Sequence, residues 1–504
     1  MRTCTLINLP RYDTDSPPAA LAILQSICNQ NNVKSYLLDF NIVLFKSLTH
    51  TEWSQLDDWC MFLKKTIPIE LQNKIIKLWE QQLVEFNLSK NDIVGVSIFS
   101  YYSLPIAKLL IPILRKYTKA LIVLGGNGCT SKFMGSNEYF DKWINQNNFA
   151  DFIVYGDGEP GFHDILNNKY EGNGINDKQS VVEHDLNNFP IPSYKNFPFE
   201  DYTSDKIYIT GSRGCVRKCT FCDIANIWPT FRYRSAENLV KEIKQQYYEH
   251  GITLFDFTDS LINGSQSNFY KFNCLLAEEK QKHPELKEIS YIGQAICKPK
   301  SQTPDHHFEA MYYGGCKQMT IGLESFSESV RNHMKKKFSN TDIDYHLEKC
   351  SEWGIENVFL MLTGYPTETI NDHYENLNGL SKYQKYAKNG TITMIRWGYT
   401  MHLYSDTPIT KPSMLKTLQI HADHRYQDMP EIALIGHNAK QENIEIIDYP
   451  YTWISDLNPS LDLKERIRRR IELHELTCKL NYPQANVHSE LETVYKLSKQ
   501  LTNS

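Results

Sequence analysis

Three cysteines, Cys215, Cys219 and Cys222, lie within one eight-residue stretch that follows the apolar run 207–210. Iron–sulfur clusters are held by cysteine thiolates, and a [4Fe–4S] cluster that only carries electrons has four of them. A C-x3-C-x2-C triplet supplies three thiolates and leaves one iron open to another ligand. The preceding Gly-Ser-Arg-Gly, residues 211–214, allows close backbone approach and adds positive charge near the thiolates.

Other readings of the triplet are a zinc site, disulfides or buried structural cysteines. Zinc requires a fourth Cys or His at short spacing, and His184 and His250 are badly spaced for that role. Disulfides are not expected in a chain that lacks a secretory signal. Three cysteines beside glycine and arginine are an unusual pattern for core packing. The sequence therefore favours an iron–sulfur cluster at Cys215, Cys219 and Cys222.

The triplet resembles the cluster motif of the radical S-adenosylmethionine (radical SAM) superfamily, including the aromatic Phe221 before its third cysteine. The resemblance implies that SAM binds the open iron. It also implies that one electron from the cluster cleaves SAM to methionine and a 5′-deoxyadenosyl radical. An external reductant of the flavodoxin or ferredoxin type would supply that electron.

The composition is that of an ordinary globular protein. The chain has 504 residues, 41% hydrophobic and 22% charged, with a net charge of −5, so we expect two to four domains. The negative charge argues against a general nucleic-acid binder. No apolar run is long enough to span a membrane. The other nine cysteines are scattered singly, as in a reducing cytoplasm, which is the expected location.

Residues 1–167 alternate strands with helices, and residues 46–90 look like a helical insertion. This alternation predicts a Rossmann-like, doubly wound parallel sheet. Two strands end in glycines, at 125–128 and at 156–161, and the strand ends mark a candidate binding edge. The second segment fits G-x-G-x-x-G, but no strand bearing a carboxylate follows it, which argues against a dinucleotide site.

This N-terminal arrangement resembles the cobalamin-binding-like domain that precedes many radical SAM cores. Ser97, Gly125 and Gly126 match the positions that surround the cobalamin nucleotide tail in that family. The resemblance therefore implies bound cobalamin. The chain departs from the pattern because it has no Asp-x-His-x-x-Gly motif to supply a lower cobalt ligand, so a cobalamin-free domain is the alternative.

A linker is expected over 168–205, followed by a radical SAM core over 206–395. Six strand–helix units predict a partial (β/α)6 barrel of the TIM type, whose functional groups lie at the carboxyl ends of the strands. The resemblance implies that SAM is contacted there by residues at three strand ends. They are Asp259 after the second strand, Gly322, Glu324 and Ser325 after the fourth, and Gly364, with Pro366 and Glu368, after the fifth. Gln294 stands where many relatives carry Arg.

Each of these positions has a structural alternative. Asp259 could be the N-cap of the next helix, and Gly364 and Pro366 could simply shape a turn. A buried glutamate without a partner would be costly, which favours a functional role for Glu324.

Residues 396–504 form a mostly helical C-terminal region that we expect to close the barrel and select the substrate. A helix over 462–480 carries an arginine cluster that we interpret as a solvated face, with a phosphate-bearing or nucleic-acid ligand as the alternative. The cluster comprises Arg466, Arg468, Arg469 and Arg470. Tyr399, His402, Tyr404 and Trp453 either line a substrate pocket or pack in the core.

The leading hypothesis is a radical SAM enzyme that uses cobalamin as a C-methyltransferase, acting on a small molecule or biosynthetic intermediate. A second hypothesis keeps the radical chemistry without cobalamin, in a rearrangement, cyclisation, oxidation or methylthiolation. Methylthiolation would need a second cluster, for which Cys4, Cys28, Cys60 and Cys129 offer no convincing pattern. A third is a metal-bound, nucleic-acid-binding scaffold with no enzymatic activity.

Overall fold

The computed structural model describes residues 2–61, 66–131, 133, 138–169, 181–403, 407–423, 425 and 453–483. The chain divides into two compact units, Met1–Ile209 and Thr210–Ser504. Residues 170–180 of the predicted linker, and Tyr404, lie outside the described residues. Among the helices that the structure describes, none combines the length and apolar character needed to cross a lipid bilayer.

The first unit contains a five-stranded sheet in the order β2-β1-β3-β4-β5, and all of its strand pairs are parallel. Its strands are β1 (Thr3–Asn8), β2 (Lys34–Asp39), β3 (Ile93–Ser97), β4 (Leu121–Gly125) and β5 (Phe152–Val154). β1 and β3 are almost wholly buried, as expected of strands covered on both faces. The predicted doubly wound sheet is confirmed.

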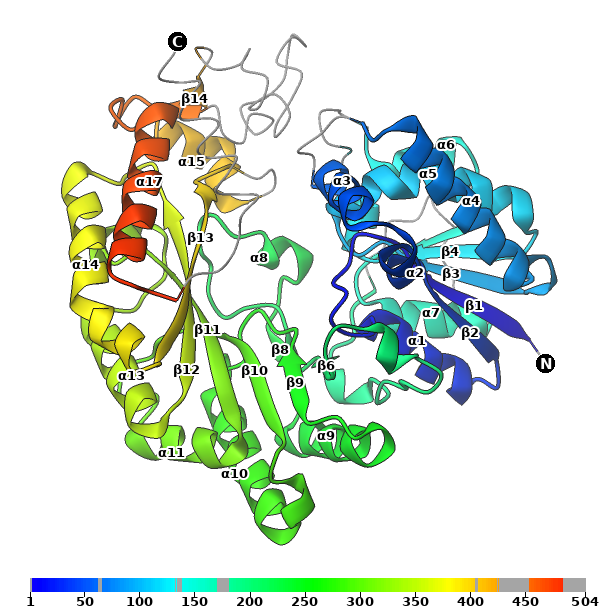
Figure 1. Cartoon of the computed structure of the whole chain (residues 1–504), viewed down its shortest axis with the longest axis horizontal. Helices are drawn as coiled ribbons and strands as arrows, with labels where there is room; N and C mark the ends of the chain where they lie inside the picture. Colours follow the sequence, from blue (N-terminus) through cyan, green and yellow to red (C-terminus); the bar gives the residue numbers. More distant parts are fainter. Residues whose placement is uncertain are drawn as a thin grey trace. The chain divides into compact units, whose positions relative to one another are not determined.

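Helices cover both faces of this sheet (Figure 1), with α1 and α7 on one side and α4 and α5 on the other. They are α1 (Ala19–Gln30), α2 (Phe40–Ser47), α3 (His50–Cys60), α4 (Ile69–Glu85), α5 (Leu104–Tyr117), α6 (Phe140–Gln146) and α7 (Gly158–Leu166). The predicted helical insertion contains α3 and α4. In α4 the buried residues Leu71, Ile75, Trp79 and Leu83 recur every four positions, which is the stripe that anchors an amphipathic helix.

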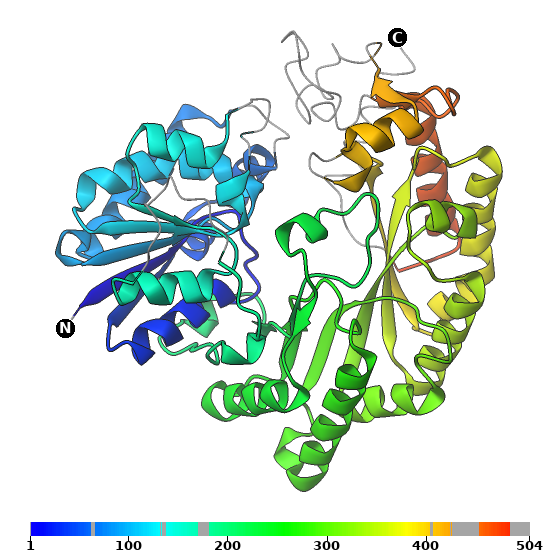
Figure 2. The same cartoon turned by 180° about the vertical axis from the view of Figure 1, so that it is seen from behind.

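The second sheet has six strands in the order β13-β12-β11-β10-β9-β6, and β9 to β13 pair in parallel. Its strands are β6 (Lys206–Ile209), β9 (Leu254–Phe257), β10 (Ser290–Ala295), β11 (Cys316–Glu324), β12 (Glu356–Thr363) and β13 (Ile392–Thr400). The sheet is curved and open, with the helices along its outer face (Figure 2). This is the predicted partial barrel.

The helices between the barrel strands are α9 (Ala236–His250), α10 (Gln266–Lys282), α11 (Asp305–Gly314), α12 (Glu328–His333), α13 (Asn340–Trp353) and α14 (Ile370–Lys388). A hairpin, β7 (Ser212–Arg213) with β8 (Arg232–Tyr233), and the short helix α8 (Ile224–Ile227) frame the cysteine segment. The C-terminal region adds α15 (Pro412–Thr417), the antiparallel pair β14 (Ile420–Ala422) and β15 (Trp453–Ser455), and α17 (Leu463–Lys479).

Candidate metal centre and cofactor sites

The three cysteines lie on the loop between β7 and α8, just beyond the carboxyl end of β6. All three are free thiols and partly exposed. Burial raises the pKa of Cys219, and it raises the pKa of Cys222 to about 11. The Cys215 and Cys219 charges also raise the pKa of Cys222, so the three sulfurs interact electrostatically. A metal must therefore displace protons from this loop when it binds.

The start of the cysteine loop needs a glycine. Gly214 has φ +84°, and a Cβ there would lie 2.5 Å from the backbone oxygen of Thr230. A side chain at this position would separate the two strands of the β7–β8 hairpin. The predicted close approach of the glycine lead-in is thus found at Gly214.

Asp259, after β9, holds the entrance of the same loop. Its carboxylate accepts hydrogen bonds from the backbone N–H of Gly211 at 2.7 Å and from the Ser212 hydroxyl at 2.5 Å. The side chain is buried, and burial raises its pKa to about 6. The N-cap alternative is wrong, because α10 begins after Ser265. Asp259 therefore positions the cluster loop, and a contact with SAM stays a prediction.

The opposite side of the loop is fixed at Thr220. Its hydroxyl bonds the Tyr365 hydroxyl at 2.8 Å, and its backbone N–H donates to the Met334 carbonyl at 3.1 Å. The backbone N–H of Ile409 donates to the Thr220 carbonyl at 2.7 Å. Segments that follow α12, β12 and β13 therefore converge on the residue after Cys219, and they hold the loop at the carboxyl ends of the barrel strands.

Glu324 ends β11 and forms a buried ion pair with Lys336. The Glu324 Oε1 to Lys336 Nζ distance is 2.9 Å, and the side chains are 12% and 8% exposed. A Cβ on Gly322 would lie 2.8 Å from Lys336 Nζ and 2.9 Å from Glu324 Oε1. Gly322 thus leaves the space that the pair occupies.

Lys336 was not identified from the sequence. It stands in a run of three lysines, which is typical of a solvated surface, and only the flanking Met334 and Phe338 hint at burial. Its ammonium lies 5.6 Å from the centre of the Phe221 ring, within cation–π range. Burial opposes its charge, but Glu324 and Cys219 outweigh burial and raise the pKa of Lys336.

Ser325 is fully buried and bonded within the fold. Its hydroxyl donates to Asn376 of α14 at 3.0 Å and accepts from the backbone N–H of Ser327 at 3.1 Å. Arg331 donates to its carbonyl at 2.6 Å. These contacts describe a structural corner after β11, and SAM binding by Ser325 stays a prediction. Gln294, near the end of β10, is exposed.

Gly364 and Glu368 belong to a turn after β12 that contacts α17. Gly364 has φ +83°, and a Cβ there would lie 2.5 Å from Cδ of Arg466. The Glu368 carboxylate accepts from the Gly364 backbone N–H at 2.9 Å and from Arg469 at 3.0 Å. Burial raises the pKa of Glu368. The glycine therefore allows close contact with the C-terminal helix.

The interpretation of the arginine cluster as a solvated face is wrong for three of its four members. Arg466, Arg469 and Arg470 are 0%, 2% and 3% exposed, and only Arg468 points outward. Arg470 donates to the carbonyl of Gly398 on β13 at 2.7 Å. These three side chains attach α17 to the barrel and are not available to a phosphate or nucleic acid.

Of the four predicted pocket-lining residues, Trp453 is a core residue. It is fully buried, its indole N–H donates to the Met401 carbonyl at 3.0 Å, and the Arg466 guanidinium stacks 3.9 Å from its ring. His402 is partly exposed. The side chain of Tyr399 and all of Tyr404 lie outside the described residues.

In the first unit, the predicted residues share one edge of the sheet. Ser97 and Gly125 are register partners at the ends of β3 and β4, and both are partly exposed. A Cβ on Gly125 would meet nothing within 4 Å, whereas one on Gly126, at φ +102°, would lie 2.3 Å from the Ile98 carbonyl oxygen. Next to this edge, the rings of Tyr12 and the exposed Phe99 meet edge to face at 4.9 Å.

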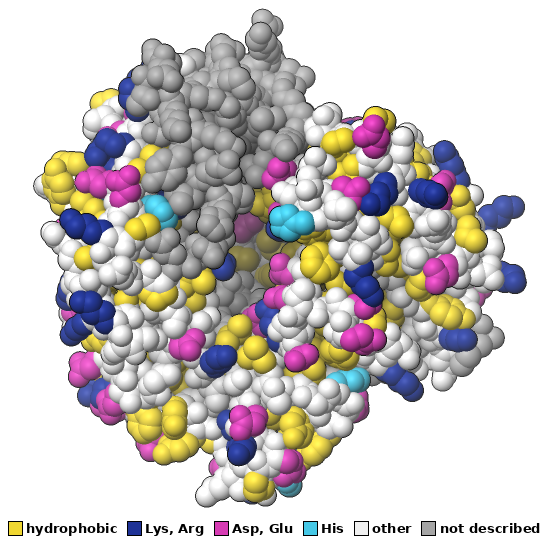
Figure 3. All heavy atoms as spheres, viewed as in Figure 1, with side chains coloured by type: hydrophobic (Ala, Val, Ile, Leu, Met, Phe, Trp, Pro, Cys, Tyr) yellow, Lys and Arg dark blue, Asp and Glu magenta, His cyan; other side chains and the backbone are white. Residues whose placement is uncertain are grey.

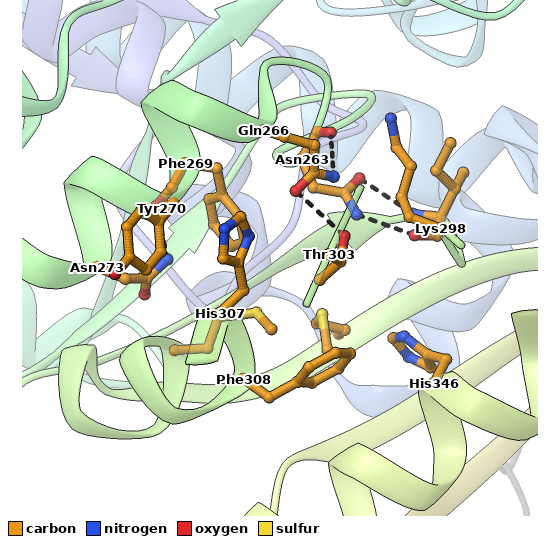
Figure 4. Close-up of a pocket in the computed structure, with 13 residues that line it drawn as sticks. Asn263, Gln266, Phe269, Tyr270, Asn273, Lys298, Thr303, His307, Phe308 and His346 are labelled. Atoms are coloured by element: carbon orange, nitrogen blue, oxygen red, sulfur yellow. Dashed lines mark hydrogen bonds between the residues drawn. The ribbon is translucent and has the colours of Figure 1, made fainter. Parts of the chain in front are cut away.

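A separate hollow lies in the helix layer of the second unit (Figure 4). Several of its polar residues are hydrogen-bonded to their surroundings. Asn263 bonds the backbone of Ile296, Thr303 bonds Gln266, and the His346 ring bonds Asn357 at 2.8 Å. The His307 ring stacks on Tyr270 at 4.3 Å. We therefore interpret the hollow as a feature of the packing between α10, α11 and α13.

No three His, Cys, Asp or Glu side chains of the described residues gather closely enough for a single metal ion. A [4Fe–4S] cluster makes a different demand, one thiolate on each of three irons, and the cysteine loop offers three partly exposed thiols for it. The donor set fits the cluster.

Comparisons with known proteins cover both units. The sequence model of the Radical SAM superfamily matches residues 209–378. An uncharacterized methyltransferase of Pyrococcus horikoshii is 23% identical over 44% of this chain and 50% of its own length. Cytidylyl-2-hydroxyethylphosphonate methyltransferase of Streptomyces wedmorensis is 24% identical over 54% of this chain and 59% of its own length. The chain thus spans between half and two thirds of these relatives.

Two solved structures resemble the chain over 94% of its length. The radical SAM methyltransferase TsrM from Kitasatospora setae, with cobalamin and a [4Fe–4S] cluster bound, has a TM-score of 0.62 at 14% identity and is covered to 89%. The cobalamin-dependent SAM radical enzyme OxsB, with aqua-cobalamin and SAM bound, has a TM-score of 0.65 at 15% identity and is covered to 66%. These likenesses show the fold. The family match, which includes the cysteine loop, leads to one conclusion: residues 209–378 are a radical SAM superfamily domain.

Proposed function

We propose that this protein is a radical SAM enzyme that holds a [4Fe–4S] cluster on Cys215, Cys219 and Cys222 and uses it to cleave SAM reductively. The observation that carries the proposal is the cysteine loop itself. Three partly exposed thiols project from a segment that is clamped by Asp259 on one side and by Met334, Tyr365 and Ile409 through Thr220 on the other. When bound, the cluster and SAM supply a 5′-deoxyadenosyl radical.

The chain's own residues hold and orient this chemistry. The hydrogen bonds from Gly211 and Ser212 to Asp259 fix where the loop leaves the barrel. Lys336, over Phe221, places a positive charge beside the loop. We further propose that SAM contacts the ends of β9, β11 and β12, at Asp259, Glu324 and Gly364.

We propose cobalamin-dependent C-methylation as the reaction. One support is the edge of the first sheet, where a Cβ on Gly125 would meet nothing within 4 Å and Ser97 lies beside it. The other is that two of the relatives are named as methyltransferases. At this edge Ser97, Gly125 and Gly126 would hold the cobalamin. The loop after β1 carries no histidine, so the cobalt would lack a histidine from that loop.

A radical reaction without cobalamin is the second candidate, favoured by that missing histidine. Methylthiolation is disfavoured among such reactions. Cys4, Cys28, Cys60 and Cys129 are all buried, at 0 or 1% exposure, and they come from four different elements, so they do not offer three accessible thiolates for a second cluster.

A nucleic-acid-binding scaffold has less support, because three of the four α17 arginines are buried. On the face shown in Figure 3, basic and acidic side chains are interspersed. We propose a small-molecule substrate, an external flavodoxin or ferredoxin as reductant and a cytoplasmic location. We also propose domain limits at 1–167, 206–395 and 396–504.

The test is an anaerobic assay of iron-reconstituted protein with SAM, a one-electron reductant and hydroxocobalamin. The proposal predicts 5′-deoxyadenosine in the products and corrinoid absorption that survives desalting. Deoxyadenosine without retained corrinoid would favour the second candidate. Absence of SAM cleavage in protein that holds a full cluster would contradict both.

A further inference from the structure

Lys336 is the buried member of a run of three lysines, Lys335 to Lys337, whose outer two are exposed. The two outer lysines have φ +63° and +57°, and Glu324, the partner of Lys336, has φ +66°. A left-handed backbone conformation is unfavourable for residues other than glycine. It persists where the surrounding structure enforces it, commonly at functional sites. The backbone at three positions is thus strained around one ion pair.

The strained segment is bonded to the cysteine loop. The Met334 carbonyl accepts from the backbone N–H of Thr220, and the Lys336 ammonium sits over the ring of Phe221. Thr220 and Phe221 are the two residues between Cys219 and Cys222. The geometry therefore fixes a positive charge against the part of the loop that carries two of the three thiols.

The two charges of the Glu324–Lys336 pair do not act equally on the cysteine loop. Lys336 is the member of the pair that approaches the loop, with its ammonium 5.6 Å from the centre of the Phe221 ring. Because both side chains are nearly enclosed, solvent screens them weakly. The positive member of the pair therefore lies against the loop.

We propose that Lys336 sets the reduction potential of the cluster on this loop, raising it by stabilising the added electron, and that Glu324 limits the rise. The inference rests on the proposed cluster and deepens it. Net charge near an iron–sulfur cluster is one of the determinants of its potential. Reduction adds one electron, supplied by the external reductant, and a fixed cation makes that addition more favourable.

The test is a redox titration of reconstituted protein, followed by the visible absorption and electron paramagnetic resonance of the cluster. We expect Glu324→Gln, which leaves Lys336 unbalanced, to have a higher midpoint potential than wild type. Lys336→Met should have a lower one, with the double variant between Lys336→Met and wild type. At a fixed poise, Lys336→Met should change the reduced-to-oxidised ratio about tenfold, which is about 59 mV for one electron, and Glu324→Gln should change it less.

The neighbouring residues Lys335 and Lys337 provide matched controls for Lys336. Lys335→Met and Lys337→Met remove the same charge from the same segment at exposed positions, where solvent screens it, so their potentials should equal that of wild type. Lys336→Arg keeps the positive charge, so its midpoint potential should equal that of wild type.

The outcomes separate this inference from the proposed function. If wild type binds no iron, the cluster itself is refuted. If all variants hold a full cluster at one common potential, the cluster stands and the role of Lys336 is refuted. A purely structural pair would lower iron content in both single variants without shifting the potential in opposite directions.

Discussion

Glu368, in the turn after β12, and Arg469, on α17, form an ion pair at 3.0 Å with side chains 1% and 3% exposed. Their positions are 101 residues apart in the sequence. The pair fixes the C-terminal helix to the carboxyl end of the barrel sheet. Because Glu368 also accepts from the Gly364 backbone N–H, the same contact shapes the turn.

Arg469→Met should destabilise the second unit by about 3–5 kcal/mol, because it leaves the Glu368 carboxylate buried without its charge partner. The measurement is urea unfolding followed by tryptophan fluorescence. Arg468→Met is the matched control. Arg468 is 51% exposed and pairs with Glu465 and Glu472 at the surface, so its loss should cost less than about 1 kcal/mol. Equal costs for the two variants would refute the structural role given to Arg469.

Asp259→Ala should reduce the iron bound after reconstitution, because the Gly211 N–H and the Ser212 hydroxyl lose their acceptor and the cluster loop loosens. Asp259→Asn keeps an acceptor oxygen and should retain more iron. Iron and sulfide assays on the purified variants measure this directly. Full iron content in Asp259→Ala would show that the loop does not depend on the carboxylate.

Acid should destabilise the second unit partly through His346, which lines the hollow in Figure 4. Burial lowers the pKa of its ring from 6.5 to about 4. Between these values the unfolded state binds more protons than the folded state, so stability falls as the pH falls through that window. At pH 5.5 the loss is about 1.4 kcal/mol for this group.

His346→Gln should flatten that pH dependence, since glutamine does not titrate and can still donate to Asn357. Urea midpoints at pH 7.5 and 5.5, compared between wild type and variant, give the change in slope. An unchanged slope would mean that His346 is protonated equally in both states.

Neighbouring glycines separate folding from cofactor binding in the first unit. Gly126→Ala should destabilise the unit, because its Cβ would collide with the Ile98 carbonyl at a positive φ. Gly125→Leu places a side chain where a Cβ meets nothing within 4 Å, so folding should be retained while cobalamin binding weakens. Corrinoid titration and thermal unfolding of both variants provide the two readouts. Undiminished cobalamin binding by Gly125→Leu would move the corrinoid away from this edge.

Local patterns were enough to predict the strands and the cysteine loop. Apolar runs indicated the alternation of strands and helices in residues 1–167, and the spacing of Cys215, Cys219 and Cys222 needed no tertiary information. Asp259 was predicted as a functional position by the family resemblance, since it follows a parallel strand whose carboxyl end carries functional groups. Its actual partners, Gly211 and Ser212, lie 48 and 47 residues away, which no local pattern reveals.

Charge runs were misleading where tertiary contacts bury them. The α17 arginines resemble a surface pattern, but Arg470 donates to a backbone carbonyl of β13 and Arg469 donates to the Glu368 carboxylate. Arg466 donates to the backbone carbonyls of Trp453 and Leu461. Lys336 was missed for the same reason, since its carboxylate partner, Glu324, lies at the end of β11. A buried charge needs a partner, and that partner is identified only when the fold brings the two segments together.

The proposed chemistry depends on the cluster, and one measurement tests for it directly. It is the iron content and visible spectrum of anaerobically reconstituted wild type beside the Cys215/Cys219/Cys222→Ala triple variant, with Cys274→Ala and Cys478→Ala as controls from elsewhere in the chain. We predict a broad absorption band at about 400 nm from thiolate-bound iron in wild type and both controls, and its loss in the triple variant. A triple variant that keeps the band and its iron would contradict the central claim.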